Sequence, residues 1–240
     1  MTPIEHSDIG NRLLGALPLK IFATLVPHLR RVELVNRATL HLPDAVIDTV
    51  YFPETGYVSM IAVLENGDAA EVGMVGREGM VGLPLVYGTD RSPVEAMVQS
   101  EGTAFSIEAD AFRRALETAP ALLKALLRYA MAFGVQVTMT AACNVQHLVD
   151  QRIARWLLMA HDRSDGDEFP MTHEFLSMML GVRRAGVTVA AGALQKAGFI
   201  SYSQGRIRIA DRPGLESAAC ECHTVVCREF NRLLGGSAKK

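Results

Sequence analysis

Hydrophobic and polar residues alternate over several short stretches between residues 31 and 107. Alternation with a period of two predicts β-strands that bury one face, and these strands are expected at 32–35, 49–52, 57–63, 69–75, 94–98 and 103–107. Asn66-Gly67 separates two of them and is a preferred sequence for a tight hairpin turn. No helical pattern lies between the strands, so they predict an antiparallel β-roll of the jelly-roll type after a small helical segment at 11–29.

Helical spacing replaces this alternation after residue 107. A short helix is expected at 108–117, and Pro120 opens a much longer helix that extends to about residue 147. Apolar and small residues recur along the long helix at alternating intervals of four and three, the pattern of a coiled-coil seam. The residues of this predicted seam are Leu123, Leu127, Ala130, Gly134, Val137, Ala141, Asn144 and Leu148.

A second apolar face lies beside the seam on the same helix, formed by Leu122, Leu126, Tyr129 and Phe133. Two faces predict that the helix packs on the β-roll with one side and on the same helix of a second copy with the other. A core helix that covers only its own β-roll would need one face, and it is the alternative interpretation.

Residues 171–211 predict two helices joined by a tight turn and followed by a hairpin. Thr172 can cap the first helix, and Gly181 can adopt the positive φ that the turn requires. The second helix is expected at 183–197, and alternating residues at 199–202 and 206–209 flank a turn that contains glycine. This is the pattern of a winged helix-turn-helix.

The exposed side of the second predicted helix and the predicted wing carry basic and polar residues. Arginine on a helix in the major groove can read guanine, while arginine on a wing can bind phosphate. The predicted DNA-binding residues are Thr172, Arg183, Arg184, Thr188, Gln195, Arg206 and Arg208. A helical hairpin and β-ribbon in an unrelated domain would show the same local pattern, so DNA binding depends on the rest of the chain.

Charge is distributed unevenly along the 240 residues, a length that suits two domains. Residues 1–150 contain 11 Lys and Arg against 17 Asp and Glu, whereas residues 151–240 contain 13 against nine, so the formal charge changes from −6 to +4. The positive half contains the predicted helix-turn-helix, which supports DNA binding. Neither a long apolar run nor an N-terminal signal segment is evident, so a cytoplasmic protein without membrane contact is expected.

The order of β-roll, long helix, short hinge and winged helix-turn-helix resembles the Crp/Fnr family of bacterial transcription regulators over nearly the whole chain. Arg152-Ile153-Ala154 with Leu157 is similar to the family's helix after the hinge, Leu180-Gly181 matches the turn, and Arg184 falls on the base-reading arginine. The resemblance implies an α+β protein with a β-roll sensor domain at 1–119, a dimerisation helix and hinge at 120–148, and a winged helix-turn-helix domain at 149–240.

The resemblance also implies a homodimer that binds a pseudo-palindromic operator in double-stranded DNA and that is not an enzyme. The segment 162–170 corresponds to a loop with which some relatives contact RNA polymerase. Two positions depart from the family pattern, because Ala185 stands where many members have Glu and Val189 where a second base-reading arginine often stands. The operator is therefore expected to differ from the family's most common one.

The signal that the β-roll would sense is left unidentified. Relatives that bind cyclic nucleotides use a Gly-Glu pair for the ribose and an Arg-Ser pair for the phosphate, whereas the candidate pocket residues here are Gly82, Leu83, Arg91 and Ser92. Leu83 cannot accept a hydrogen bond from a ribose hydroxyl, which would cost about 1 to 3 kcal/mol of affinity and disfavours a cyclic nucleotide. The alternative is a ligand-independent DNA binder with a degenerate sensor domain.

The four cysteines are Cys143, Cys220, Cys222 and Cys227. Their position argues against the N-terminal iron–sulfur cluster of Fnr-like sensors, and their small number predicts reduced thiols. Zinc could bind at 220–227, but the spacing is not that of a zinc finger. A terminal amphipathic helix is expected instead, with no metal site, and the residues expected to face the winged domain are Ala218, Cys222, Val225, Val226 and Phe230.

A cupin-type enzyme is the alternative from a different functional class. Such an enzyme needs several histidines and a carboxylate on the strands of its roll to hold a metal ion. Residues 49–107 contain no histidine, which disfavours this alternative.

Overall fold

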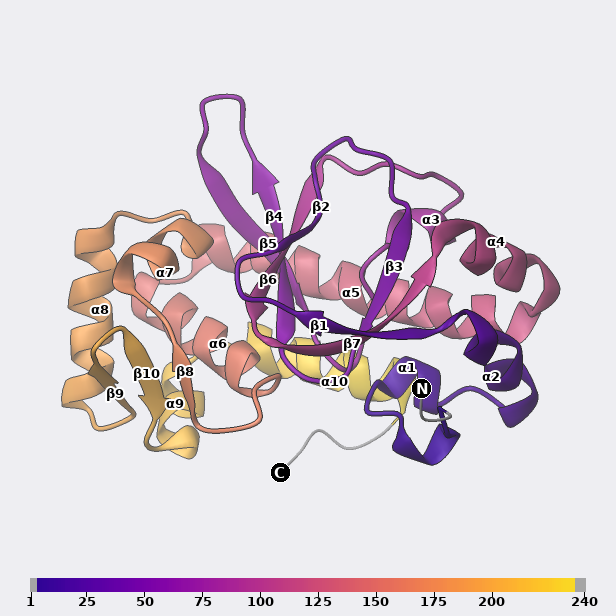
Figure 1. Cartoon of the computed structure of the whole chain (residues 1–240). Coiled ribbons are helices and arrows are strands. Elements are labelled where there is room, and N and C mark those ends of the chain that lie inside the picture. The colour runs from indigo at the N-terminus through magenta and orange to yellow at the C-terminus, as the bar shows by residue number, and fades with distance from the viewer. Residues whose placement is uncertain (1–3, 236–240) are drawn as a thin grey trace.

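The computed structural model describes residues 4–235, in which an N-terminal β-roll lies beside a C-terminal helical domain (Figure 1). The β-roll is built from two antiparallel sheets, as predicted. The first has the order β1-β7-β3, with β1 at Arg30–Leu34, β7 at Gly102–Glu108 and β3 at Thr49–Pro53. The second has the order β2-β6-β4-β5, with β2 at Thr39–His41, β6 at Val94–Ser100, β4 at Tyr57–Val63 and β5 at Ala69–Val75.

The short strand β2 is missing from the sequence prediction. Its three residues pair with β6 through an irregular register, so the strand is too short for alternation to reveal it. The hairpin predicted between β4 and β5 is present. Asp68 donates its backbone N–H to Asn66 Oδ1 at 3.0 Å, and Gly67 has a φ of 87°, a conformation that favours glycine.

Short helices cover the ends of the β-roll and complete its core. They are α1 (Arg12–Gly15), α2 (Leu19–Leu25), α3 (Leu83–Val86) and α4 (Ala109–Thr118), with 3₁₀ turns at His6–Asp8 and Val26–His28. Asn11 caps α1, because its Oδ1 accepts from the backbone N–H groups of Leu13 and Leu14. The buried residues between these helices and the strands include Leu14, Phe22, Val50, Phe52, Phe105, Ile107 and Phe112.

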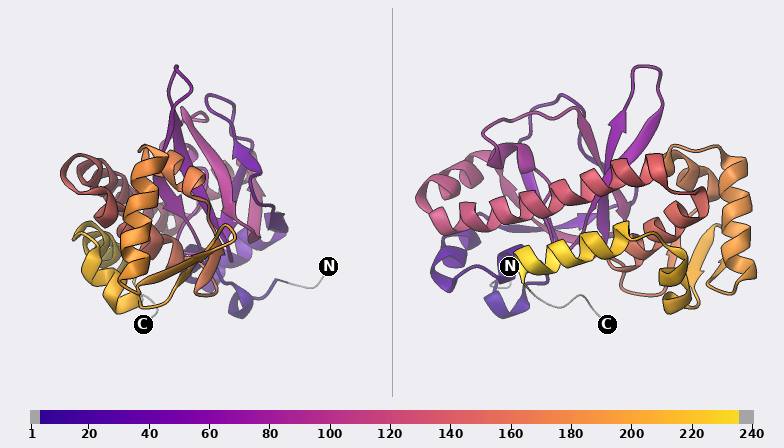
Figure 2. Two further views of the ribbon diagram at one scale, coloured as in Figure 1. Left: turned by 90° about the vertical axis from the view of Figure 1, so that its left-hand side faces the viewer. Right: turned by 180° about the vertical axis from the view of Figure 1, so that it is seen from behind.

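Helix α5 (Pro120–Gln146) has 27 residues and runs along one side of the β-roll (Figure 2). Leu122, Leu126 and Tyr129 bury the face that was predicted to pack on the roll. Buried polar groups fix its position, since the Gln136 side chain both accepts from Met74 N at 2.7 Å and donates to Met74 O at 3.1 Å. These paired hydrogen bonds hold the helix against strand β5.

The C-terminal domain contains the predicted winged helix-turn-helix. Its helices are α6 (Val149–His161), α7 (His173–Leu180), α8 (Arg184–Lys196) and α9 (Arg212–Ala218), and its sheet has the order β8-β10-β9, with β8 at Glu168–Pro170, β9 at Ile200–Ser203 and β10 at Arg206–Ile209. Strand β8 lies in the segment expected to be a polar loop. Phe169 is its buried residue, and a single apolar residue is too weak a signal to predict a strand.

The turn between α7 and α8 has the predicted local geometry. Thr172 Oγ1 accepts from the backbone N–H of Phe175 at 3.1 Å, which caps α7. Gly181 ends this helix with a φ of 60°, and α8 begins three residues later.

The two domains share a buried interface. Tyr57, Ile61 and Met74 of the β-roll belong to the same hydrophobic cluster as Trp156 and Leu180 of the C-terminal domain. Polar contacts accompany this cluster. Trp156 Nε1 donates to Glu71 Oε1 at 2.9 Å, and the buried Arg163 forms an ion pair with Glu78 at 2.7 Å. The C-terminal domain is thus held against the sheet that contains β4 and β5.

The terminal helix α10 (Cys222–Leu234) corrects one sequence prediction. It was expected to pack on the winged domain, but it runs back along α5 (Figure 2, right). Val226 and Phe230 join the core of the β-roll, and the Phe230 ring lies 6.4 Å from that of Tyr129. The amphipathic pattern correctly predicts a buried stripe, but it does not specify which surface covers that stripe.

Candidate functional site

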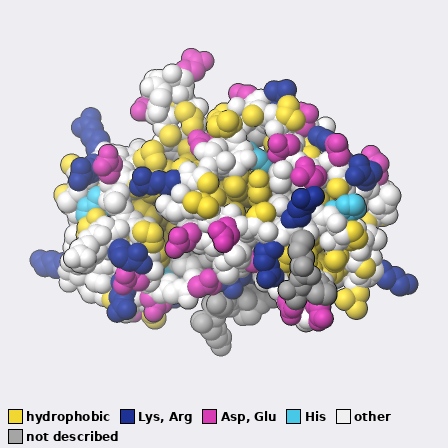
Figure 3. All heavy atoms as spheres, in the orientation of Figure 1, with side chains coloured by type: hydrophobic (Ala, Val, Ile, Leu, Met, Phe, Trp, Pro, Cys, Tyr) yellow, Lys and Arg dark blue, Asp and Glu magenta, His cyan; other side chains and the backbone are white. Residues whose placement is uncertain are grey.

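Helix α8 presents a continuous exposed face at one end of the molecule. Val187, Ala190, Ala191 and Leu194 bury the opposite face. The predicted DNA-binding residues Arg183, Arg184, Thr188 and Gln195 are all on the accessible side. Figure 3 shows Lys and Arg side chains projecting at the left-hand edge of the molecule, where Figure 1 places α7, α8 and the β9–β10 hairpin.

Thr188 lies on the exposed face of α8 and is held by two contacts. Its Oγ1 donates to the backbone carbonyl of Arg184 at 3.1 Å and lies 3.2 Å from His173 Nδ1. The His173 ring stacks on Tyr202 with a centroid distance of 4.4 Å. Burial, with the charge of Arg184 second, lowers the pKa of His173. No pattern in the sequence indicates this link between α7, α8 and the wing.

The wing arginines have a partner that the sequence prediction did not include. Arg206 pairs with Glu168 of β8 at 2.5 Å, and Arg208 lies 3.6 Å from the same carboxylate. Both guanidinium groups stay exposed to solvent. One carboxylate therefore partly neutralises the wing, which reduces its attraction for phosphate.

The exposed side of α5 is shifted from the predicted seam. Leu127, Gly134 and Ala141 are accessible as predicted, but Ala130 is buried in its own chain and Leu123 packs against the β-roll core. We define the exposed α5 face by residues spaced alternately by four and three, namely Leu127, Met131, Gly134, Thr138, Ala141 and Val145.

Each of the four residues predicted to line a ligand pocket in the β-roll has its own local contacts. Gly82 precedes α3 with a φ of 117°, and the side chain of Leu83 is buried in the hydrophobic core. Arg91 is exposed and donates to the backbone carbonyl of Asp44 at 2.7 Å, while Ser92 Oγ accepts from Val94 N. Leu83 therefore contributes an apolar side chain to the core, and Arg91 is engaged by a backbone carbonyl.

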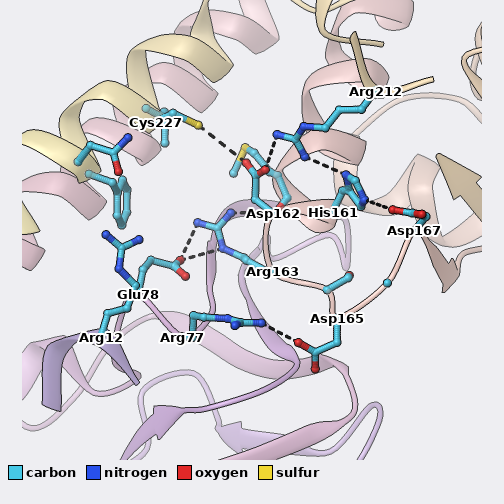
Figure 4. A pocket seen from close by; sticks show the side chains of 16 residues that line it. Arg12, Arg77, Glu78, His161, Asp162, Arg163, Asp165, Asp167, Arg212 and Cys227 are labelled. Atoms are coloured by element: carbon cyan, nitrogen blue, oxygen red, sulfur yellow. Dashed lines mark hydrogen bonds and ion pairs between the residues drawn. The ribbon is translucent and has the colours of Figure 1, made fainter. Parts of the chain in front are cut away.

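A pocket of about 350 Å³ lies between the β-roll, the end of α6 and helix α10 (Figure 4). Charged side chains dominate its lining, and most are paired with one another. Arg77 pairs with Asp165 at 2.7 Å, and Arg212 pairs with Asp162 at 2.6 Å. This pocket lies at a network of contacts between the domains, and no sequence pattern predicted it.

Histidine and cysteine extend this network from α10. His223 Nε2 lies 2.9 Å from Asp162 Oδ2 and 3.4 Å from Cys227 Sγ. Burial opposes the charged imidazolium, but the hydrogen bonds to Asp162 and Cys227 outweigh it and raise the pKa of His223 to about 9. Burial likewise opposes the charged form of Asp162, yet His223 and Arg212 lower its pKa to about 2. The charges of Asp162, His223 and Arg212 therefore compensate one another.

A second cluster, which we call the Cys3His cluster, contains Cys143, His147, Cys220 and Cys222. Their four ligand atoms all lie within 4.8 Å of one another. The Sγ atoms of Cys143 and Cys220 are 3.5 Å apart, and Cys222 Sγ is 3.7 Å from His147 Nδ1. All three cysteines are buried free thiols. Burial raises the pKa of Cys222 to about 11.

Two family models match the chain. The model described as a cyclic nucleotide-binding domain matches residues 31–119, and the model described as a Crp-like helix-turn-helix domain matches residues 151–218. A search of curated proteins finds no matching sequence. No helix of residues 4–235 is long and apolar enough to cross a membrane.

Solved structures share the fold at low sequence identity. FixK2 from Bradyrhizobium japonicum is 14% identical, with a TM-score of 0.68 over 80% of this chain and 98% of the other. The c-di-GMP responsive global regulator CLP from Xanthomonas campestris is 20% identical, with a TM-score of 0.64 over 80% and 99%. A CRP/FNR-family transcriptional regulator from Thermus thermophilus is 21% identical, with a TM-score of 0.65 over 79% and 98%.

Proposed function

Because the chain belongs to the Crp/Fnr family of transcription regulators, with a sensor domain and a helix-turn-helix domain, we propose that it binds a pseudo-palindromic operator as a homodimer. The exposed face of α8 is the observation that carries this proposal. Arg183 and Arg184 stand at the first turn of α8, where a helix in the major groove contacts base edges.

Arg184 is the proposed reader of guanine. A bidentate contact from arginine to O6 and N7 of guanine discriminates by about 1 to 3 kcal/mol against another base. Val189 lies five residues further along the same helix and is 74% exposed. An exposed valine on this face is suited to contact a thymine methyl group. The proposed half-site therefore contains a guanine that Arg184 binds and a thymine whose methyl group contacts Val189. The second guanine that another arginine would bind is not expected.

The exposed α5 face is the proposed dimer interface. Leu127, Met131 and Val145 expose between 48% and 79% of their surface, while Gly134 and Ala141 permit close approach of a second helix. An apolar stripe of this length on a solvent-exposed helix is typical of a protein contact. Dimerisation through α5 would present two copies of α8 to successive major grooves.

The sensor geometry supports a signal other than a cyclic nucleotide. Leu83 lies in the core and Arg91 is bound to the carbonyl of Asp44, so neither is placed to hold a ribose or a cyclic phosphate. A ligand-independent DNA binder is the second candidate, and calorimetric titration with cyclic AMP and cyclic GMP separates both from a cyclic-nucleotide sensor. Residues 165–168 are exposed, so the loop proposed to contact RNA polymerase is accessible at the surface.

Selection of bound fragments from genomic DNA, followed by fluorescence anisotropy, tests the DNA-binding proposal. We expect Arg184→Ala to weaken binding to the selected operator by about 10- to 100-fold and to leave the dimer intact. Arg228→Ala is the matched control, since it removes the same charge from α10, where Arg228 is exposed. Equal operator affinity of the wild type and Arg184→Ala would refute the assigned role of this arginine.

A further inference from the structure

The Cys3His cluster lies outside both segments that match a family model. Cys143 and His147 end helix α5, before residue 151, and Cys220 and Cys222 follow residue 218. The sensor and reader functions therefore do not account for these four side chains. Their thiols are buried, with 0% to 5% of the cysteine surface exposed.

The distances in the Cys3His cluster match those around a single tetrahedral metal ion. Zinc binds sulfur at about 2.3 Å and imidazole nitrogen at about 2.0 Å, so two sulfur ligands of one zinc lie about 3.8 Å apart. The observed Sγ–Sγ distance of 3.5 Å and Sγ–Nδ1 distance of 3.7 Å are close to this value. In a [4Fe–4S] cluster each ligand binds a different iron atom, and in a [2Fe–2S] cluster the four ligands divide into two pairs on separate iron atoms. Four ligand atoms that all lie within 4.8 Å of one another therefore fit a single ion better than a cluster.

The orientation of His147 fits a metal ligand. Its Nδ1 faces Cys222 Sγ, and its other nitrogen, Nε2, lies 3.3 Å from a carboxylate oxygen of Glu221. A metal-bound histidine usually donates its second ring N–H to a carboxylate, which fixes the ring and strengthens the ligand. Glu221 directly precedes Cys222 in the chain. The same short segment therefore supplies the ligand Cys222 and the carboxylate that orients the ligand His147.

Two buried arginines provide the charge that a thiolate site requires. Arg152 and Arg155 are 8% and 4% exposed, and the Nε atom of each lacks a hydrogen-bond partner among residues 4–235. Their guanidinium groups donate to neutral oxygens, Arg152 to the backbone carbonyl of Leu180 and Arg155 to the hydroxyl group of Thr140. Arg155 lies near the cluster, because its Nη2 donates to Thr140 Oγ1 of α5 at 2.7 Å, and Thr140 is three residues from Cys143 in the chain.

Buried charges are costly unless an opposite charge compensates them. A divalent ion with three thiolates and one neutral imidazole carries one net negative charge. Such a site would place a negative charge close to the buried Arg155, which contacts α5 at Thr140, three residues before Cys143. The net charge of such a site is thus complementary to the charge of the two buried arginines.

We propose that Cys143, His147, Cys220 and Cys222 bind one Zn²⁺ ion, which fastens the segment before α10 to the end of α5. The hinge residue Leu148 lies between α5 and α6, so the ion joins the point where the chain enters the DNA-binding domain to the point where it leaves. Zinc is the preferred ion because thiolate and imidazole in tetrahedral geometry are its usual structural ligands.

Metal analysis by mass spectrometry tests the ligand set. Protein purified under reducing conditions without chelator is expected to contain about one zinc per chain. Cys222→Ser and Cys143→Ser are expected to lose it. Cys227→Ser is the matched control, because Cys227 lies on the same helix but belongs to the satisfied group around Asp162. This control is expected to retain zinc.

The orientation of His147 has a separate test that does not require loss of the ion. Glu221→Gln is expected to weaken zinc binding about 10- to 100-fold in competition with a chromophoric chelator. His147→Cys replaces the imidazole ligand by a thiolate, so it is expected to keep four ligands and to retain zinc. Circular dichroism checks that each variant is folded.

Three results would overturn the proposal. The first is wild-type protein with reduced thiols that neither contains zinc nor takes it up. The second is equal loss of zinc from Cys227→Ser and Cys222→Ser. The third is an iron–sulfur chromophore or a Cys143–Cys220 disulfide in the purified protein in place of zinc.

Trp156 is the chain's single tryptophan and lies in the domain interface, so its fluorescence is expected to change when zinc is removed.

Discussion

Glu71 connects the β-roll to the DNA-binding domain through a buried carboxyl group. Its Oε1 accepts from Trp156 Nε1 at 2.9 Å, and its Oε2 accepts from Ser59 Oγ at 2.5 Å. Burial raises the pKa of Glu71 to about 7, although hydrogen bonds from Ser59 and Trp156 and the positive charges of Arg155 and Arg163 oppose the rise. Replacement by Gln removes the titration and can keep both contacts, with its Oε1 accepting from Trp156 and its Nε2 donating to Ser59 Oγ.

The pH dependence follows from the two pKa values of this carboxyl group. In the unfolded chain Glu71 titrates near its ordinary value of 4.5, and in the folded protein near 7. The folded state therefore holds the proton more tightly, so the contribution of Glu71 to stability is fully present below pH 4.5 and is lost as the pH rises through 7. At about 1.4 kcal/mol per pKa unit, the loss amounts to about 3 kcal/mol.

Glu71→Gln is expected to lack this loss. Urea unfolding followed by Trp156 fluorescence, between pH 5 and pH 8.5, measures the free energy of unfolding at the domain interface. We expect the variant to be more stable than the wild type by up to about 3 kcal/mol at pH 8.5, with a much smaller difference at pH 5. Other groups, such as His223, titrate in both proteins, so the difference between them isolates Glu71.

The exposed Glu65 provides a matched control, because Glu65→Gln removes a carboxylate from the β4–β5 turn. This control is expected to follow the wild-type pH dependence. If Glu71→Gln also followed it, with a constant offset from pH 5 to pH 8.5, the carboxyl group would not hold a proton in the folded protein, and the reasoning would be wrong.

Three further predictions concern the helices around this interface. Met131→Glu places a charge on the exposed α5 face and is expected to yield monomers in sedimentation velocity, whereas Arg114→Glu on α4 is expected to leave the dimer intact; a dimeric Met131→Glu would exclude this face. Phe230→Ala removes the ring that packs on α5 and is expected to lower the free energy of urea unfolding by about 3 to 5 kcal/mol; a loss below about 1 kcal/mol would show that α10 is not held there. Arg163→Met leaves Glu78 buried without its ion-pair partner, with the backbone N–H of Gly76 still donating to it, and is expected to cost about 3 to 5 kcal/mol; unchanged thermal stability would contradict this.

Periodic elements of the fold could be predicted from the sequence. The strands β4 and β5 repeat their alternation over seven residues, and the pattern from Thr172 to Gly181 combines a cap, a helix and a turn, so each has several independent signals. The three-residue strands β2 and β8 lack such a repeat. Their formation depends on pairing with distant strands, which local pattern does not encode.

The candidate site was predictable only where its residues are close in sequence. Arg183, Arg184 and Thr188 follow from the spacing of one helix. The Cys3His cluster combines residues 77 positions apart, Cys143 and Cys220, so the sequence prediction considered only the C-terminal cysteines and rejected them for their spacing. The position of α10 on α5, which brings the four side chains together, was the missing information.

The order of synthesis determines when the contact between α10 and α5 can form. Helix α5 leaves the ribosome before the whole DNA-binding domain is made, whereas α10 is the last helix of the described chain. Until then the groove that receives Phe230 beside Tyr129 is open to water. Contacts between such distant segments form late in folding, so a chain that lacks α10 would leave the apolar stripe around Tyr129 on α5 uncovered.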